Sequence, residues 1–383
     1  MQVEKLEDIC EIASGGTPKR SEDSYWKNGK IPWLKISDIK SKYVDKSEEH
    51  ITQKGLDNSS AKLFKKGTII YTIFATVGEV AILNIDATTN QAIAGLTIKD
   101  SAQINPSYLF YFLKSIKKQM HLLSRGVAQN NINLSVLRQI KVPIPDLNVQ
   151  ERIVNALDQM QNNIKLRQME LSKLDILIKA RFVEMFGDLK FDTPVSKYIE
   201  SLTAGKSLAG KEKCTNKVLN TGAVSYDKFK NDYKYLPSNY VPDENNKVRT
   251  GNVLISRMNT QELVGATAYV WEAPENTYLP DRLWRANLKE NVNSIFLWQV
   301  LIHPLLKLQI QRVSSGTSGS MKNISKSNFL KLKVPDVNEE SQNKFASFVQ
   351  QVDKSKVVNA SIMKYIISIR FYLYFKENKE GAR

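Results

Sequence analysis

The residues of this sequence that are best suited to chemistry are arginine and asparagine side chains in polar loops. The tripeptide Arg257-Met258-Asn259 directly follows a predicted strand at 251–255. A guanidinium fits the two acceptors of guanine in the major groove of duplex DNA, and a primary amide fits the donor and acceptor of adenine. Each good bidentate contact contributes about 1–3 kcal/mol of discrimination between bases. Arg257 and Asn259 are therefore the preferred candidates for direct base recognition.

Further cations and polar side chains of this kind occur in both halves of the chain. Cations suit phosphates, whereas amides suit base edges. In the first half the candidates for DNA binding are Lys19, Arg20, Lys35, Ser37, Arg125, Asn130, Asn131 and Asn133. In the second half, besides Arg257 and Asn259, they are Lys206, Arg282, Arg285, Ser315, Lys322 and Asn323.

Some of these positions also have a structural interpretation. Trp284 lies between Arg282 and Arg285 in a repeated segment, so we expect a core residue rather than a base-stacking platform. The two arginines fit structural ion pairs as well as DNA contacts. The polar loops around Asn131 and Asn323 fit solvated connectors, although their recurrence at one place in both halves favours a function.

The net charge favours a polyanionic partner. The 383 residues include 55 Lys and Arg against 39 Asp and Glu, a formal charge of +16. Nucleic acid fits better than a membrane, because the sequence has no evident basic amphipathic surface helix and no apolar run of about 18 residues. A proteome of generally basic proteins would produce the same charge without a function.

Motifs of common enzymes are missing. The run LTAGKS at 202–207 resembles a phosphate-binding loop, but Glu200 stands where that loop needs a glycine, so Lys206 is interpreted as a solvated or DNA-facing lysine. The Asn-Pro-Pro-aromatic tetrapeptide of amino-group methyltransferases is absent. The three histidines lack the spacing of metal ligands: His50, His121 and His303. We therefore predict that the chain has no catalytic residue, no metal and no cofactor.

The N-terminus and the cysteines predict a cytoplasmic protein. Residues 1–5 lack the basic and apolar pattern of a signal peptide. Cys10 and Cys214 are too few for a disulfide framework.

An internal repeat organises the candidate residues. A shift of 192 residues places Asn131-Ile132 on Asn323-Ile324, Lys141-Val142-Pro143 on Lys333-Val334-Pro335, and Gln150 on Gln342. Strand-like segments also correspond, for example 67–71 and 251–255, whereas the loops at 37–63 and 221–246 share almost nothing. One architecture with two sets of loops suggests two different recognition tasks.

Two long helices follow the two strand-rich segments. Apolar or long side chains recur from Ile153 to Met185 in alternating steps of four and three, and the shift of 192 continues this stripe in the second helix. So narrow a stripe needs a partner helix, and we predict that the two helices pair. Asn148 is the predicted N-cap of the first helix, and the second begins near Glu339. The predicted interface comprises Ile153, Leu157, Met160, Ile164, Leu171, Leu174, Ile178, Phe345, Val349, Val352, Met363 and Ile366.

The chain resembles the specificity subunit of a type I restriction-modification system, HsdS. The resemblance covers essentially the whole chain and rests on the order of several motifs, which occur around a two-fold repeat. The motifs are LEDICEIASGGTP at 6–18, Lys35-Ile36-Ser37-Asp38-Ile39, Thr89-Asn90-Gln91-Ala92, Val142-Pro143-Ile144-Pro145 and Gln150-Glu151-Arg152-Ile153.

This resemblance implies an α+β fold with two target-recognition domains in tandem, at 1–145 and 189–336. Each would bind one half of a bipartite, asymmetric site in double-stranded DNA. The central helix at 146–188 and the C-terminal helix at 337–383 would form an antiparallel coiled coil that holds the two domains apart.

The resemblance also implies partners that perform the chemistry. Two modification subunits would dock on the chain and methylate adenine at N6 with S-adenosylmethionine. Restriction subunits would add cleavage that requires ATP and magnesium. The chain itself would be a non-catalytic subunit.

Two other functions stay open at this point. A coiled-coil scaffold or adaptor with an incidental basic charge would show no steeply salt-dependent DNA binding. A self-sufficient nuclease or methylase would be active as the purified chain alone.

Overall fold

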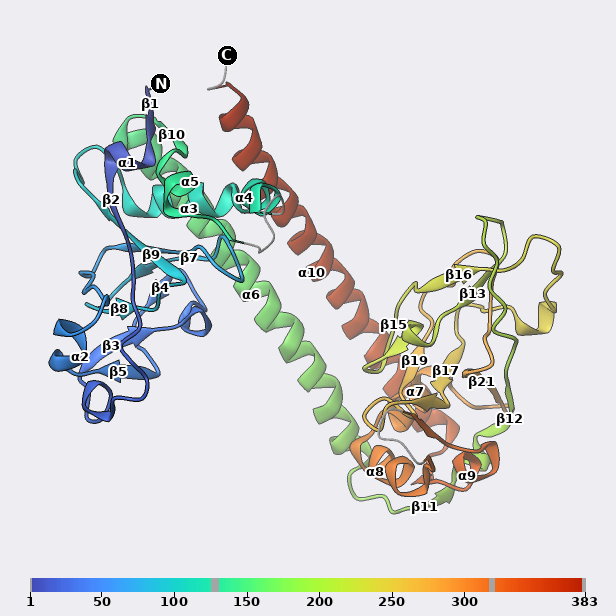
Figure 1. Ribbon diagram of the computed structural model, residues 1–383. Helices are drawn as coiled ribbons and strands as arrows, with labels where there is room; N and C mark the ends of the chain where they lie inside the picture. Colours follow the sequence, from blue (N-terminus) through green and yellow to red (C-terminus); the bar gives the residue numbers. More distant parts are fainter. Residues whose placement is uncertain (1, 125–130, 317–320, 381–383) are drawn as a thin grey trace. The chain divides into compact units, whose positions relative to one another are not determined.

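A computed structural model of the protein describes residues 2–124, 131–316 and 321–380 (Figure 1). The chain forms two compact units: unit 1 comprises Met1–Gln168 and Ser361–Arg383, and unit 2 comprises Met169–Ala360. Two long helices contribute to both units, α6 (Leu147–Phe186, 40 residues) and α10 (Glu339–Glu380, 42 residues). Within each unit strands and helices are mixed, so the predicted α+β class is confirmed.

Unit 1 contains two sheets and one separate strand pair. Its strands are β1 (Gln2–Lys5), β2 (Cys10–Ser14), β3 (Ile31–Leu34), β4 (Tyr43–Val44), β5 (Glu49–Ile51), β6 (Ile69–Thr72), β7 (Val80–Leu83), β8 (Thr88–Thr89), β9 (Ile93–Ile98) and β10 (Lys141–Ile144). The larger sheet has the order β2-β9-β6-β7-β4, the smaller one has the order β5-β3-β8, and β1 pairs with β10. The shorter helices are α1 (Leu6–Ile9), α2 (Gln53–Asp57), α3 (Pro106–Ser115), α4 (Lys117–Ser124) and α5 (Leu134–Arg138).

Unit 2 repeats this plan. Its strands are β11 (Phe191–Pro194), β12 (Ile199–Thr203), β13 (Lys217–Leu219), β14 (Val224–Ser225), β15 (Lys228–Phe229), β16 (Tyr233–Tyr235), β17 (Val253–Ser256), β18 (Met258–Asn259), β19 (Thr267–Tyr269), β20 (Thr277–Tyr278), β21 (Leu283–Leu288), β22 (Lys322–Asn323) and β23 (Lys333–Pro335). They form sheets in the orders β12-β21-β17-β19 and β16-β13-β20, and the pairs β11-β23, β14-β15 and β18-β22. The helices are α7 (Ser294–Leu301), α8 (Pro304–Val313) and α9 (Lys326–Leu330).

Local backbone features recur at the positions that the repeat predicts. Gly67 and Gly251 precede β6 and β17 with φ angles of +93° and +89°, a conformation that strongly favours glycine. The side chains of Asn105 and Asn293 cap α3 and α7 by accepting hydrogen bonds from the first N–H groups of each helix. The repeated Lys-Val-Pro lies in β10 and in β23. The internal repeat is therefore confirmed.

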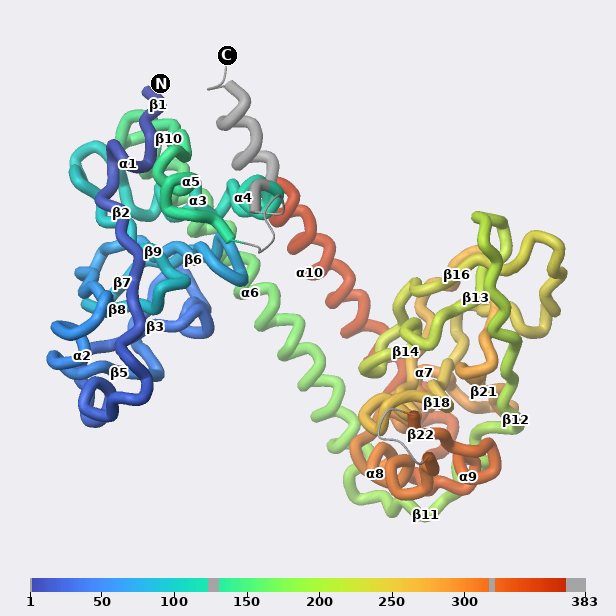
Figure 2. The backbone as a smooth tube through the Cα atoms, viewed as in Figure 1, coloured from blue at the N-terminus to red at the C-terminus, as the bar shows by residue number. Residues whose placement is uncertain are grey.

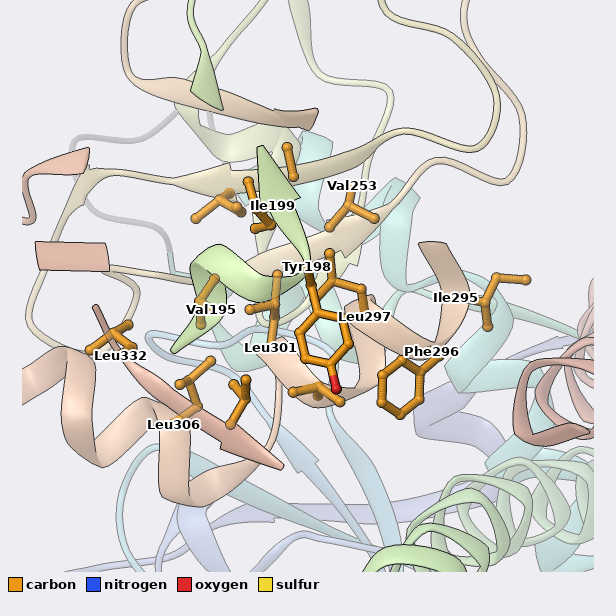
Figure 3. Close-up of a cluster of buried hydrophobic side chains, with 14 of the residues drawn as sticks. Val195, Tyr198, Ile199, Val253, Ile295, Phe296, Leu297, Leu301, Leu306 and Leu332 are labelled. Carbon is orange, nitrogen blue, oxygen red and sulfur yellow. The ribbon is translucent and has the colours of Figure 1, made fainter. Parts of the chain in front are cut away.

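Each unit has its own hydrophobic core. In unit 1 residues of β6, β9 and α3 pack together with Val154 and Leu157 of α6. In unit 2 the core joins β12, β17 and α7, and Figure 3 shows Tyr198, Phe296 and Leu297 within it. Trp284 belongs to this core and is 1% exposed, as predicted.

The end of α6 packs against the beginning of α10 inside unit 2. The ring centroids of Phe182 and Phe186 each lie 5.5 Å from that of Phe345. Further along α10, Lys356 forms an ion pair with Asp175, an earlier residue of α6, at 2.5 Å. The two helices are therefore antiparallel.

The predicted stripe positions have mixed surroundings. All of them from Ile153 to Ile178 and from Phe345 to Ile366 are buried or half-buried, and so are Lys356 and Asn359. Ile153, Leu157 and Met160, however, pack into the core of unit 1, and Phe182 and Phe186 were missed because they lie beside the stripe.

One local prediction about the first long helix was wrong. Asn148 is not the N-cap of α6, because the helix begins one residue earlier, at Leu147. The carbonyl of Asp146 accepts hydrogen bonds from the N–H groups of Val149 and Gln150, so Asn148 lies within the first turn. Glu339, in contrast, begins α10 as predicted.

Candidate nucleic-acid interface

Most of the predicted DNA-binding residues of unit 2 meet at one short strand pair. The short strands β18 and β22 lie side by side (Figure 2). They are antiparallel, with Met258 opposite Asn323 and Asn259 opposite Lys322. The N–H of Arg257 donates to the carbonyl of Arg282 at 3.1 Å, and Asn323 exchanges two backbone hydrogen bonds of 2.9 Å with Ser315. Four separate segments thus form what we call the Arg257 cluster: Arg257, Asn259, Arg282, Ser315, Lys322 and Asn323.

The cations of the Arg257 cluster have no acidic partner among the described residues. No carboxylate there lies within 4.0 Å of the charged atoms of Arg257, Arg282 or Lys322, although the ammonium of Lys322 donates to the carbonyl of Gly316 at 2.9 Å. The guanidinium carbon of Arg257 lies 5.7 Å from the ring centroid of Trp284, a distance typical of a cation–π contact. Their charge therefore remains available to an anionic ligand.

Three buried polar atoms of this region have no hydrogen-bond partner in the described parts of the chain. They are Arg257 Nε, Trp284 Nε1 and Asn323 Oδ1. A buried donor or acceptor without a partner costs about 1–3 kcal/mol, and such atoms are uncommon in folded proteins. Their accumulation around one strand pair is typical of a site built for something other than stability.

Two predicted residues of unit 2 lie outside the cluster. Lys206 is exposed and follows Gly205, whose N–H donates to the carbonyl of Pro280 at 3.0 Å, so it lies on a segment that neighbours Arg282. Arg285 is half-buried on β21, and its Nε donates to Asn287 Oδ1 at 3.1 Å. Burial lowers the pKa of Arg285, and its recorded partners are an amide and a backbone carbonyl rather than a carboxylate.

The equivalent place in unit 1 has, among the described residues, a single β-bridge and different side chains. Phe74 and Asn131 form an isolated antiparallel β-bridge, and the N–H of Ile132 donates to the carbonyl of Ile73 at 2.9 Å. In unit 2 the N–H of Ile324 donates to the carbonyl of Arg257 at 3.1 Å. Asn131 and Asn323 therefore have equivalent positions, but Ile73 stands where unit 2 has Arg257.

The other predicted residues of the polar loop in unit 1 contribute less. Asn133 is the N-cap of α5, because its side chain accepts the N–H of Val136 at 2.9 Å. Arg125 and Asn130 lie outside the described residues.

Two of the predicted cations of unit 1 lie near β3 and β5 and are paired with acids. Arg20 and Lys35 both bind the carboxylate of Glu49, with 2.8 Å between Lys35 Nζ and Glu49 Oε1. The guanidinium carbon of Arg20 lies 3.7 Å from the ring centroid of Trp26 and 4.6 Å from that of Trp33. Hydrogen bonds from Lys35 and then Arg20 lower the pKa of Glu49. Lys19 and Ser37 are exposed nearby along the chain.

Sequence reasoning missed several residues of these surfaces. Glu49, Trp26 and Trp33 lack any local signature, because loop contacts bring them together with Arg20. In unit 2, the alternation Tyr233-Lys234-Tyr235 did offer a signal, since aromatic and basic residues that alternate are common where proteins bind nucleic acid. Lys217 on the neighbouring β13 lies over the ring of Tyr233 at 4.8 Å.

Within the described residues no group of three or more His, Cys, Asp or Glu side chains is placed to hold a metal ion. No described helix is long and apolar enough to cross a membrane. What the site offers is therefore cations, amides and aromatic rings on two similar scaffolds.

Comparison with known proteins shows which family the sequence resembles. The sequence model of the type I restriction modification DNA specificity domain matches residues 1–175. This part of the chain is similar to that domain family, and the resemblance to type I specificity subunits is thereby confirmed.

The curated relatives are specificity subunits of type I restriction enzymes. The MjaIX subunit of Methanocaldococcus jannaschii is 29% identical over 191 residues, which are 49% of this chain and 44% of the relative. The EcoR124I/EcoR124II subunit of Escherichia coli is 26% identical over 195 residues, 49% of this chain and 48% of the relative. The matches thus span about half the length of these specificity subunits.

Solved structures match the fold over nearly the whole chain. The specificity subunit from M. genitalium superimposes with a TM-score of 0.55 at 17% identity, over 97% of this chain and 94% of the other. A chain from a study of complex assembly and conformational transition of the type I restriction-modification system gives a TM-score of 0.61 at 15% identity, over 98% and 96%. Both structures share the fold of this chain.

Proposed function

We propose that the chain is the sequence-specific DNA-binding subunit of a type I restriction-modification complex. In this proposal residues 1–145 and 189–336 each read one half of a bipartite, asymmetric site, and the helices at 146–188 and 337–383 set the distance between the halves. The observation that carries it is an equivalent backbone contact in the two units, at which Arg257 of unit 2 stands in the place of Ile73 of unit 1. One scaffold with different reading groups suits an asymmetric target.

Base reading in unit 2 would come from the Arg257 cluster. Its guanidinium and amide groups match the edges of guanine and adenine, and the cation of Lys206 suits a phosphate. In unit 1, Arg20 and Lys35 would contact DNA after leaving Glu49. The remaining candidates listed from the sequence, including Arg125 and Asn130, are part of the same proposal.

The partners in this proposal are two modification subunits, and restriction subunits where the system has them. S-adenosylmethionine, ATP and magnesium would be bound by those partners. Exposed apolar side chains on the long helices support protein docking, because five described aliphatic residues there are more than half exposed: Leu166, Ile176, Val183, Val357 and Val358.

The test is co-purification of the tagged chain with a co-expressed modification subunit, followed by sequencing of methylated adenines in the host genome. The proposal expects one two-part motif with a fixed spacer. Methylation that is absent or lacks a two-part motif, together with DNA binding that does not depend on salt, would favour a coiled-coil adaptor instead.

A further inference from the structure

A buried glutamine ties the first long helix to the rest of unit 1. Gln150 lies in the first turn of α6 and is fully buried. Its Oε1 accepts the backbone N–H of Asn105 at 2.9 Å, and its Nε2 donates to the carbonyls of Gln103 at 2.9 Å and Pro145 at 2.8 Å. One amide therefore joins the helix, the strand that leads into it and the segment before α3.

The same arrangement occurs in unit 2. Gln342 lies in the first turn of α10 and is 3% exposed. Its Oε1 accepts the N–H of Asn293 at 3.1 Å, and its Nε2 donates to the carbonyl of Val337 at 2.9 Å. Pro145 and Val337 are equivalent under the shift of 192 residues, as are Gln150 and Gln342. We call these two arrangements the glutamine bridges.

Each glutamine bridge acts on a residue that itself fixes a helix. The Oδ1 of Asn105 accepts the N–H of Ser107 at 2.8 Å and caps α3, and the Oδ1 of Asn293 accepts the N–H of Ile295 at 3.0 Å and caps α7. In each unit a single glutamine side chain thus connects the first turn of a long helix to the N-cap residue of a core helix by hydrogen bonds. Because a buried amide loses its partners when either helix tilts, the bridge resists a change of angle between them.

Packing alone does not require glutamine at this place. An unbranched apolar side chain such as methionine has a similar length and would fill the same space without hydrogen bonds. The carbonyl and N–H groups that the glutamine binds are directional, so what the amide adds is orientation. Both units retain this orientation, although their loops share almost no residues.

We propose that Gln150 and Gln342 are positioning residues that fix the direction in which each long helix leaves its unit, and thereby fix the spacer between the two half-sites. This inference rests on the proposed function. A loosened bridge leaves the reading groups of both units unchanged but lets the helix leave over a range of angles. The half-sites would then stay the same while the spacer becomes less strict.

The experiment is methylome sequencing of cells that express the modification subunit with wild type, Gln150→Met or Gln342→Met. Each variant should keep both half-sites and should methylate sites whose spacer is one base pair longer or shorter about tenfold more than wild type does, a change that corresponds to 1.4 kcal/mol. Gln159→Met and Gln350→Met change exposed glutamines on the same two helices and should keep the wild-type spacer.

The possible outcomes separate the two proposals. A folded Gln150→Met and a folded Gln342→Met that both retain one strict spacer would overturn the role of the bridges. Altered half-sites would overturn it as well, because the side chains then act on base reading. If a methionine variant does not fold, Gln150→Asn or Gln342→Asn replaces it. The shorter amide is too short for the hydrogen bond to Asn105 or Asn293 and leaves no buried charge, so the same spread of spacers is expected. If wild type itself directs no methylation, the proposed function fails.

Discussion

The small sheet β5-β3-β8 of unit 1 and the sheet β16-β13-β20 of unit 2 have the same order and the same combination of one antiparallel and one parallel pair. Their side chains differ in charge. In unit 1, Trp33 lies opposite Glu49, whereas in unit 2, Lys217 lies opposite Tyr235. The corresponding backbone thus carries an acid in one unit and an aromatic ring beside lysines in the other.

This difference extends to the predicted DNA-reading cations. Arg20 and Lys35 of unit 1 share the carboxylate of Glu49, and Lys35 also pairs with Glu48. Arg257 and Arg282 of unit 2 have no carboxylate partner among the described residues. A cation that already has an acidic partner must give up that ion pair before it binds a phosphate. Its net contribution to DNA affinity is therefore smaller. An unpaired cation that binds a phosphate releases a counterion from the DNA without first losing an ion pair, so its whole contribution to affinity is retained. We therefore expect unit 2 to dominate affinity.

The largest effect is expected from lengthening both long helices. Duplicating residues 168–174 in α6 and 357–363 in α10 adds one heptad to each, about 10.5 Å of helix. The spacer should grow by about three base pairs at roughly 3.4 Å per pair, with both half-sites unchanged. Methylome sequencing measures this. A heptad in α6 alone should abolish methylation, and altered half-sites with the old spacer would contradict the role of the helices.

Among the single substitutions, Trp284→Ala, which removes the aromatic ring next to Arg257, should lower stability most. Trp284 is 1% exposed, so Trp284→Ala should lower the free energy of unfolding by about 3–5 kcal/mol. Urea denaturation monitored by circular dichroism measures this loss. Trp271→Ala is the matched control, because Trp271 is 37% exposed and should cost far less. Equal losses would show that Trp284 does not support the fold of unit 2.

Arg257→Ala should relax recognition at one base position by about 1–3 kcal/mol, since one bidentate contact is lost. The half-site read by unit 1 should stay intact. Binding of a panel of single-base variants of the methylated site provides the measurement, with Arg312→Ala, an exposed arginine of α8, as the control. If the panel shows no change at any position, Arg257 does not read a base.

Glu49→Gln should strengthen binding to all DNA sequences, because it frees Arg20 and leaves Lys35 paired only with Glu48, at 3.6 Å. We expect roughly a threefold to tenfold increase in affinity and a steeper dependence on salt, by about one counterion. Titrations at several salt concentrations measure both, and Glu290→Gln serves as an exposed control in unit 2. Weaker binding would show that Glu49 orients the two cations rather than competing for them.

The same pairs give unit 1 a stability that depends on pH. The pKa of Glu49 is lowered in the folded protein, so the contribution of its ion pairs is complete above the pKa of the unfolded carboxyl, about 4.3. It is lost as pH falls through the lower pKa of the folded state. Wild type and Glu49→Gln should thus differ least in stability at the lowest pH.

The smallest effect is expected from a phosphate contact. Lys206→Ala should weaken binding to every sequence alike and reduce the slope of log affinity against log salt by about 0.9. Lys206→Arg keeps the charge and should behave as wild type does. A loss confined to one sequence would show that Lys206 recognises bases.

The repeat made much of this molecule predictable. The stripe from Ile153 onward located α6, the equivalence of Gly67 and Gly251 located β6 and β17, and Asn131 and Asn323 marked equivalent backbone contacts. These features depend on short-range patterns that a sequence displays directly. Asn148 was misplaced because several polar residues can begin a helix and only the backbone bonds of Asp146 select the true start.

The candidate site was only partly predictable for a physical reason. Arg257, Arg282 and Asn323 are chemically conspicuous, but their meeting at one strand pair depends on strand register. The pairing of Glu49 with Arg20 across 29 residues, and the stacking of Arg20 on two tryptophans, depend on the path of long loops. Such contacts have no periodic signal.

The most direct test of the account is a domain exchange. Residues 1–145 are replaced by the corresponding residues of a type I specificity subunit with a known site, and the methylome of the host is sequenced. We expect one half-site to change to that of the donor, while the other half-site and the spacer stay as in wild type. A change in both half-sites, or in neither, would contradict the claim that each unit reads its own half.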